Sequence, residues 1–214
     1  ARTGLKDEYL GEKWFSCVKA CLDKARETGM DAWVYDENGW PSGFVGGKLL
    51  ENENYRARFL EYSVGEYDKS AFATYIADDK KGFIRVEKPL DGAKEYHNIY
   101  LRISPANSDI LNPDAVDAFI RETHEKYYER FKEYFGKELV GFFTDEPQYY
   151  RWGTPYAPSA EVEFAKDGEN IKDGLIWLFR KDERGYAFRE KYFKTLNKLY
   201  VEKFYKDIRV VRVA

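Results

Sequence analysis

The sequence predicts an α/β fold in which helices alternate with parallel strands and one antiparallel β block is inserted between them. Two observations carry this prediction. A helix followed by a short apolar strand and an acidic pair occurs twice, ending at Asp36-Glu37 and at Asp145-Glu146. Between these two units, from about residue 56 to 105, the apolar residues alternate with polar ones, which is typical of antiparallel strands.

The first helix–strand unit is clear in the apolar spacing. Apolar residues recur at helical spacing from Trp14 to Ala25, and Gly29 is a typical helix stop. Residues 32–35 then form a short apolar run that predicts a buried strand. A loop rich in glycine and proline follows over residues 36–47.

In the inserted block we expect strands over residues 58–64, 71–77, 83–86 and 97–103, with a hairpin loop at 78–82. The second unit begins where Asn112 caps a long helix that has Pro113 at its first position and ends at Gly136. The near-continuous apolar run 139–143 predicts a parallel strand. A polar loop region is expected from there to about residue 185, before a last helix.

Composition and charge narrow the classes of function. The chain has 214 residues, 43% of them hydrophobic and 18% aromatic, with a formal charge of -3. This balance gives no reason to expect nucleic acid or an anionic membrane as a partner, and no run approaches the ~20 apolar residues of a membrane helix. The first four residues contain neither an initiator Met nor an apolar signal core. We therefore expect a processed or excised segment, and its location, cytoplasmic or secreted, stays open.

The two acidic pairs suggest a chemistry. Ligands of parallel α/β folds bind at the carboxyl ends of the strands, so both pairs are expected at one edge. Glycoside hydrolysis needs two such carboxyl groups, one to protonate the leaving oxygen and one to activate water or attack the sugar. Pro147 is expected to hold Glu146 in an extended conformation. The competing interpretation is that acidic residues after strands are simple helix caps and turn formers.

Three ordered segments resemble one known family. They are residues 33–47, the run Thr123 to Tyr127, and the run Phe143 to Pro147, and together they are similar to motifs of the α-L-rhamnosidase-like glycoside hydrolases. The resemblance implies a (β/α)8 TIM-type barrel that hydrolyses terminal deoxysugar linkages with inversion, often with a calcium ion at the site. Because such a barrel needs about 250 residues, we expect residues 1–214 to hold part of one, with 56–105 as its antiparallel insertion and with further domains in a longer chain.

The resemblance also implies roles for individual residues. Glu146 is the candidate general acid, and Glu37 is the candidate second catalytic carboxylate. Asp36 and Asp145 are candidate substrate-binding residues, with metal binding by the pair at 36 and 37 as the alternative. Apart from the resemblance, Trp40 and Trp152 follow the two acidic pairs and are candidates for stacking on a sugar ring, and the equal alternative for Trp40, beside Pro41, is to pack its loop onto the barrel.

Three classes of function stay open on the sequence alone. The chain is either an enzyme acting on a glycoside or oligosaccharide, or a carbohydrate-binding or structural module without chemistry, in which the aromatics matter and the carboxylates do not. A third possibility is an interaction protein that uses its tyrosine-rich surface. His124, Cys17 and Cys21 all lie on or beside apolar helix faces, so we expect a core histidine and two buried thiols.

Overall fold

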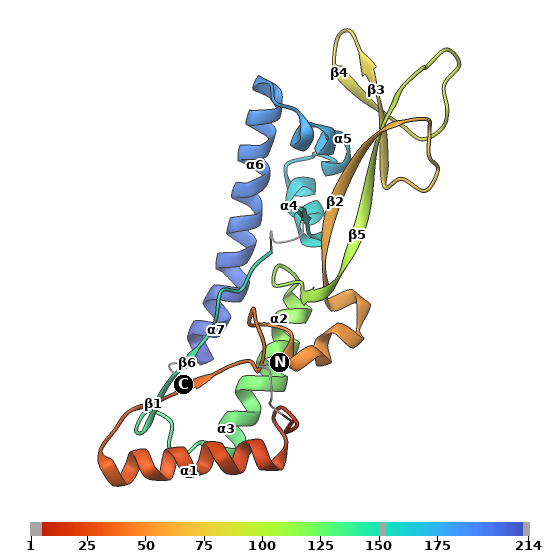
Figure 1. Cartoon of the computed structure of the whole chain (residues 1–214). Coiled ribbons are helices and arrows are strands. Elements are labelled where there is room, and N and C mark those ends of the chain that lie inside the picture. Colours follow the sequence, from red (N-terminus) through yellow and green to blue (C-terminus); the bar gives the residue numbers. More distant parts are fainter. Residues whose placement is uncertain (1–5, 150–152, 212–214) are drawn as a thin grey trace. The chain divides into compact units, whose positions relative to one another are not determined.

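The computed structural model describes residues 6–149 and 153–211, and it divides into two compact units. Unit 1 comprises residues 1–56, 105–149 and 201–214, and unit 2 comprises residues 57–104 and 150–200. Both acidic pairs belong to unit 1. Helices and strands are labelled in Figure 1.

Unit 1 is built on two parallel strands and the helices that cover one of their faces. Its elements are α1 (Glu12–Thr28), β1 (Ala32–Tyr35), the 3-10 helices η1 (Val45–Glu51) and η2 (Glu53–Tyr55), α2 (Pro113–Phe119), the π-helix η3 (Ile120–Glu125), α3 (Lys126–Phe131), β6 (Leu139–Phe143), all but the first residue of the π-helix η5 (Tyr200–Tyr205) and α7 (Lys206–Val211). β1 pairs with β6 in parallel, as predicted, with Val34 opposite Phe142.

The predicted signals at Gly29 and Asn112 are confirmed, whereas the helical stretch that begins at Pro113 ends at Phe131 and not at the predicted Gly136, where the chain has already left the helix. Gly29 takes the left-handed conformation, with a φ of 65°, and its N–H caps the carbonyl of Ala25. The Asn112 side chain accepts the N–H of Asp114 at the start of α2, and Pro113 occupies the first turn. The core of the unit gathers residues from α1, α3, the turn that follows α3, and the two strands: Phe15, Leu22, Val34, Tyr127, Phe131, Tyr134, Leu139 and Phe142.

Unit 2 contains an antiparallel sheet and a set of helices. The elements are β2 (Arg56–Gly65), β3 (Ala73–Asp78), β4 (Gly82–Val86), β5 (Tyr96–Ser108), β7 (Thr154–Tyr156), α4 (Pro158–Lys166), α5 (Ile171–Gly174), η4 (Leu175–Phe179) and α6 (Glu183–Leu199). The strand order is β4-β3-β5-β2-β7. β3 and β4 form the predicted hairpin, with Asp78 opposite Gly82.

The expected long polar loop before the last helix is wrong. β7, α4, α5 and η4 occupy that stretch, and their apolar residues pack inside unit 2. Phe164, Leu175 and Ile176 are buried, and the Tyr75 hydroxyl donates to the Lys172 carbonyl. These helices are too short for a clear apolar period, so the contacts with the sheet rather than the local pattern decide them.

The predicted (β/α)8 barrel is also wrong. Among the described residues the only parallel strands are β1 and β6, which form a two-stranded sheet, and the other strands make the antiparallel sheet. A barrel of this kind needs eight parallel strands in a closed ring. The sequence contains only two helix–strand units. The barrel prediction assumed further units of this kind, for which the chain has no corresponding apolar pattern.

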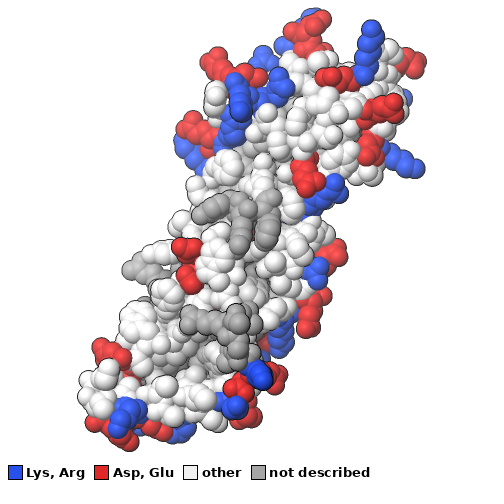
Figure 2. All heavy atoms as spheres, viewed as in Figure 1, with Lys and Arg blue, Asp and Glu red and all other residues white. Residues whose placement is uncertain are grey.

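Charged residues of both signs share the surface. Figure 2 shows Lys and Arg side chains interspersed with Asp and Glu on the visible face. Within the described part of the chain, no helix combines the length and apolar character that crossing a bilayer requires.

Candidate functional site

The two acidic pairs lie at the same edge of the parallel sheet, as predicted. The Asp36 N–H donates to the Phe143 carbonyl at 3.2 Å, so the ends of β1 and β6 run side by side. Ser42 joins the two loops that follow. Its N–H donates to the Asp145 carbonyl and its hydroxyl accepts the Asp145 N–H, both at 2.9 Å. The loops that carry the carboxylates are therefore tied to each other.

Asp36 is the centre of a buried network. Its side chain has no solvent exposure. The Ser42 hydroxyl donates to Oδ1 at 2.7 Å and the Thr144 hydroxyl donates to Oδ2 at 2.5 Å. His124 Nε2 lies 3.3 Å from Oδ2. Asp36 was predicted to bind substrate, but a carboxylate that is enclosed and engaged in this way positions its neighbours instead.

His124 reaches Asp36 from the π-helix η3. The side chain is fully buried, as expected, with its ring edge-on to Phe119 and Phe142 at centroid distances of 5.1 and 4.8 Å. A π-helical turn rotates the residues that follow it relative to an α-helix, and such turns are frequent at functional sites. The local widening thus places His124 beside the strand ends.

Glu37 is held by backbone N–H groups of its own loop. Its carboxylate is buried and accepts the N–H groups of Asn38, Phe44, Val45 and Gly46 at 2.6 to 3.0 Å. Two successive left-handed residues, Val45 with φ 54° and Gly46 with φ 62°, turn these groups toward one point, as in a backbone nest that binds an anion. We call this arrangement the Glu37 nest.

Burial raises the pKa of the Glu37 carboxyl, while the four N–H groups act in the opposite direction because they stabilise the charged form. With two N–H groups on each oxygen, the carboxylate has its acceptor positions filled. The geometry therefore favours a structural role for Glu37 over the predicted catalytic one, and the loop after β1 is the part of the molecule that it organises.

Asp145 and Glu146 are the members of the two pairs that reach solvent. Asp145 is half-buried and Glu146 is exposed. Tyr35 lies next to Asp145, with its hydroxyl 3.4 Å from Oδ2, and it donates to the Gly39 carbonyl. Burial, and then the charge of Asp145, raise the pKa of Tyr35 to about 12.

Glu146 has an unusual backbone. Its φ is +40°, in the left-handed region, so the expected extended conformation is wrong. The proline that follows disfavours the right-handed helical region, but the chain turns through the left-handed one instead. Such a conformation costs about 1 to 3 kcal/mol in a non-glycine residue and is found preferentially at functional sites.

Exposed aromatic side chains accompany these carboxylates. Trp40, in the loop after β1, is 44% exposed, and Phe143, the last residue of β6, is 54% exposed. Exposed rings of this kind offer flat apolar surfaces to a ligand. Trp152, the other predicted stacking residue, lies outside the described residues.

The donor groups do not fit the calcium ion that the resemblance implies. Calcium takes six to eight oxygen ligands. The oxygens of Asp36 and Glu37 are engaged by hydroxyl and N–H donors. Over residues 6–149 and 153–211, no group of three or more His, Cys, Asp or Glu side chains is placed to hold a metal.

Three parts of this site were not predicted from the sequence. Ser42 and Thr144, which hold Asp36, carry only a weak local signal, namely a hydroxyl residue directly after a strand or in its loop. The role of His124 depends on the π-helix, which has no recognisable pattern. The Glu37 nest had a signal in Gly46-Gly47, since adjacent glycines allow the left-handed turn that it needs.

No protein-family model, no curated protein and no solved structure matches this chain. What can be said of its function therefore depends on the residues of the site. Of the six residues predicted from the sequence, two are buried in hydrogen-bonded networks, three are at least partly accessible, and one lies outside the described part.

Proposed function

We propose that the chain is the carboxylate-bearing part of a glycoside hydrolase that cleaves terminal deoxysugar linkages, with Glu146 as the proton donor. The observation that carries the proposal is the placement of Glu146. It is an exposed carboxylate in a strained backbone conformation, and it follows a residue whose backbone is bound on both sides by Ser42. A fixed, accessible carboxyl group is what general acid catalysis requires.

In the proposed reaction Glu146 donates its proton to the glycosidic oxygen while the bond between that oxygen and the anomeric carbon breaks. A water molecule adds its oxygen to the anomeric carbon, and its proton passes to a second carboxylate. Asp145 takes this second role in place of Glu37, because the Glu37 carboxylate is occupied by its nest. Attack by water in a single step gives inversion.

Substrate binding in this proposal uses the aromatic surface. Trp40 stacks on the apolar face of the sugar ring, and Phe143 contacts the methyl group that distinguishes a deoxysugar from its parent. The sugar class itself comes from the resemblance of the sequence motifs to α-L-rhamnosidase-like enzymes. The partners proposed are a glycoside or oligosaccharide substrate and further domains of a longer chain.

A second candidate function is a carbohydrate-binding module without chemistry. One observation favours it: two of the four predicted carboxylates, those of Asp36 and Glu37, already accept hydrogen bonds from hydroxyl and N–H groups of the protein itself. Under this alternative the exposed aromatics bind sugar and Glu146 contributes only a hydrogen bond.

The test compares two substrates in the Glu146→Gln variant, using the full protein. We expect hydrolysis of an alkyl α-L-rhamnoside, whose leaving group needs a proton, to fall at least ~100-fold. Hydrolysis of a nitrophenyl α-L-rhamnoside should fall much less, because that leaving group departs as an anion. Glu129→Gln, at an exposed position on α3, is the control and should match the unaltered protein.

A binding module gives a different result. It hydrolyses neither substrate, and Glu146→Gln changes sugar affinity only modestly while Trp40→Ala abolishes it. Unchanged hydrolysis of both substrates by Glu146→Gln would show that another residue is the proton donor.

A further inference from the structure

Ser42 connects the loop after β1 to the segment that precedes Glu146. Its hydroxyl donates to Asp36 Oδ1 at 2.7 Å and accepts the Asp145 N–H at 2.9 Å. Its own N–H donates to the Asp145 carbonyl, also at 2.9 Å, and the residue is buried. A hydroxyl has a single proton. Because that proton is directed at Asp36, the oxygen is left as the acceptor for the Asp145 N–H, and the buried carboxylate fixes the direction of this contact.

The loop that carries Ser42 is held from within and from outside. The Glu37 nest closes residues 37–46 into a turn. Directly after Ser42, the Gly43 carbonyl accepts the Ser108 hydroxyl. Gly43 has a φ of 127°, and a Cβ at this position would lie 3.2 Å from Ser108 Oγ, so the two backbones approach closely. Ser42 therefore stands on a part of unit 1 that these contacts keep in place.

The segment before Glu146 is supported by the same buried carboxylate. The Thr144 hydroxyl donates to Asp36 Oδ2 at 2.5 Å, and Asp145 is linked to Asp36 through Ser42. Glu146 follows directly, with its left-handed φ of +40°. The position of the Glu146 carboxyl group thus follows from the position in which Asp145 is held.

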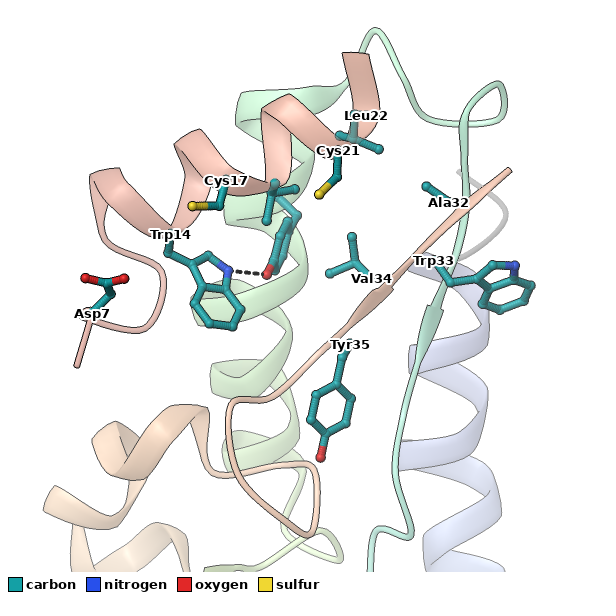
Figure 3. Close-up of a pocket in the computed structure, with 11 residues that line it drawn as sticks. Asp7, Trp14, Cys17, Cys21, Leu22, Ala32, Trp33, Val34 and Tyr35 are labelled. Carbon is teal, nitrogen blue, oxygen red and sulfur yellow. Dashed lines mark hydrogen bonds between the residues drawn. The ribbon is translucent and has the colours of Figure 1, made fainter. Parts of the chain in front are cut away.

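Tyr35 reaches the side chain of Asp145 rather than its backbone. Its hydroxyl lies 3.4 Å from Asp145 Oδ2. Figure 3 shows Tyr35 at the end of β1, beside a pocket of about 320 Å³ that lies between this strand and α1. Ser42 and Tyr35 therefore hold different parts of the same residue.

The pocket between α1 and β1 is separate from the acidic pairs. Trp14, Val18 and Val34 line it together with Cys17 and Cys21, and none of the carboxylates of the two acidic pairs, all of which the structure describes, is among its lining residues. Both thiols are exposed, so the expectation that they are buried is wrong. Apolar spacing gives the direction of the packing face of a helix, whereas its width depends on how many strands lie beneath the helix.

We propose that Ser42 is a positioning residue, which transmits the fixed position of Asp36 to the backbone of Asp145 and so places the Glu146 carboxyl group for proton transfer. This inference rests on the proposed function, in which Glu146 is the proton donor. Catalytic groups must be held within about 0.5 Å of their productive geometry, and a displacement of about 1 Å can cost ~100-fold in rate. Removal of the Ser42 hydroxyl leaves the Asp145 N–H without that acceptor and lets the segment shift.

The experiment compares Ser42→Ala with the unaltered full protein on the alkyl and the nitrophenyl α-L-rhamnoside. The ratio of the alkyl rate to the nitrophenyl rate reports the proton donor, because the base and the sugar contacts serve both substrates. The ratio does not depend on the fraction of folded protein, since unfolding lowers both rates alike. We expect it to fall at least ~10-fold in Ser42→Ala. Ser42→Cys, whose thiol fills the site but is a weaker donor and acceptor, should lower it at least ~3-fold and serves if the alanine variant does not fold.

A second background shows whether Ser42 acts through Glu146. In Glu146→Gln the proton donor is already absent, so the addition of Ser42→Ala should leave the ratio within ~2-fold. Ser16→Ala is the matched control. Ser16 is exposed on α1, where its hydroxyl donates to the Glu12 carbonyl at 2.8 Å, and its substitution should leave the ratio unchanged.

Three results would overturn the inference. An unchanged ratio in Ser42→Ala, with both rates reduced alike, would give Ser42 a structural role only. A further fall of the ratio when Ser42→Ala is added to Glu146→Gln would mean that Ser42 acts through another group. Absence of hydrolysis of both substrates by the unaltered protein would refute the proposed function itself, whereas the first two results, obtained with an active protein, would refute only the role of Ser42.

Discussion

His124 and Asp36 meet inside unit 1, 88 residues apart in the sequence, with Nε2 of the histidine 3.3 Å from Oδ2 of the aspartate and both side chains fully buried. One comes from a π-helix and the other from the end of a strand. Their contact ties the helical layer to the loop that carries the first acidic pair.

The coupling between these two residues is measurable. We expect His124→Phe and Asp36→Asn each to lower the free energy of unfolding by about 1 to 3 kcal/mol, because the first removes the imidazole that lies 3.3 Å from the buried carboxylate and the second replaces a carboxylate oxygen that accepts a hydroxyl with an amide group. The double variant should lose at least ~1 kcal/mol less than the sum of the two. Urea unfolding of the four proteins checks this. The other histidine is the control, since His97 lies in unit 2 beside Tyr62, and His97→Phe should add to Asp36→Asn without coupling.

The Glu37 nest predicts chemical rescue. Glu37→Ala removes the anion and leaves four N–H groups without an acceptor, so we expect a loss of at least ~3 kcal/mol of stability. Formate or acetate should then enter the nest and raise the Tm of this variant, but not that of the unaltered protein. Thermal unfolding at constant ionic strength makes the measurement, with chloride as the comparison salt. An equal response of the two proteins to formate would contradict the nest.

The backbone of Glu146 predicts that glycine is preferred there for stability. Both Glu146→Gly and Glu146→Ala remove the carboxylate, but only glycine tolerates a φ of +40° without strain. We expect the glycine variant to be more stable than the alanine variant by about 1 kcal/mol, measured by urea unfolding, and both to lack activity. Equal stability of the two would mean that this position is not strained in solution.

Tyr35 predicts a change in stability at high pH. The pKa of Tyr35 is raised from its usual 10 to about 12 in the folded chain. A raised pKa means that the folded state keeps the phenol proton longer than the unfolded state. The resulting stability is fully present below pH 10 and is lost as the pH rises toward 12.

Comparison with Tyr35→Phe isolates this contribution. The variant cannot ionise at this position, so the difference in unfolding free energy between the two proteins should shrink from pH 10 to pH 12. Tyr128→Phe, at an exposed tyrosine on α3, is the matched control for the loss of one phenol hydroxyl. A constant difference for Tyr35→Phe across this range would contradict the shift.

Local pattern determined much of the secondary structure. The helical spacing from Trp14 to Ala25, the left-handed stop at Gly29, the cap at Asn112 and the hairpin at residues 78–82 are all decided by neighbours in the sequence, and the structure confirms each of them. The parallel pairing of β1 with β6 was also predictable, because each strand follows a helix of adequate length.

The tertiary structure alone decided which carboxylates face solvent. Both acidic pairs follow an apolar strand in the sequence, the second one residue later because Thr144 intervenes, yet the first pair is buried and the second reaches solvent. The difference comes from partners that lie far along the chain, His124 and Thr144 for Asp36, and from the backbone turn at residues 44–46 for Glu37. The number of strands in a sheet is likewise a long-range property. Apolar spacing records that a strand has a buried face, but it does not record how many neighbours that strand will have, which is why two correct helix–strand units led to a barrel that the chain does not form.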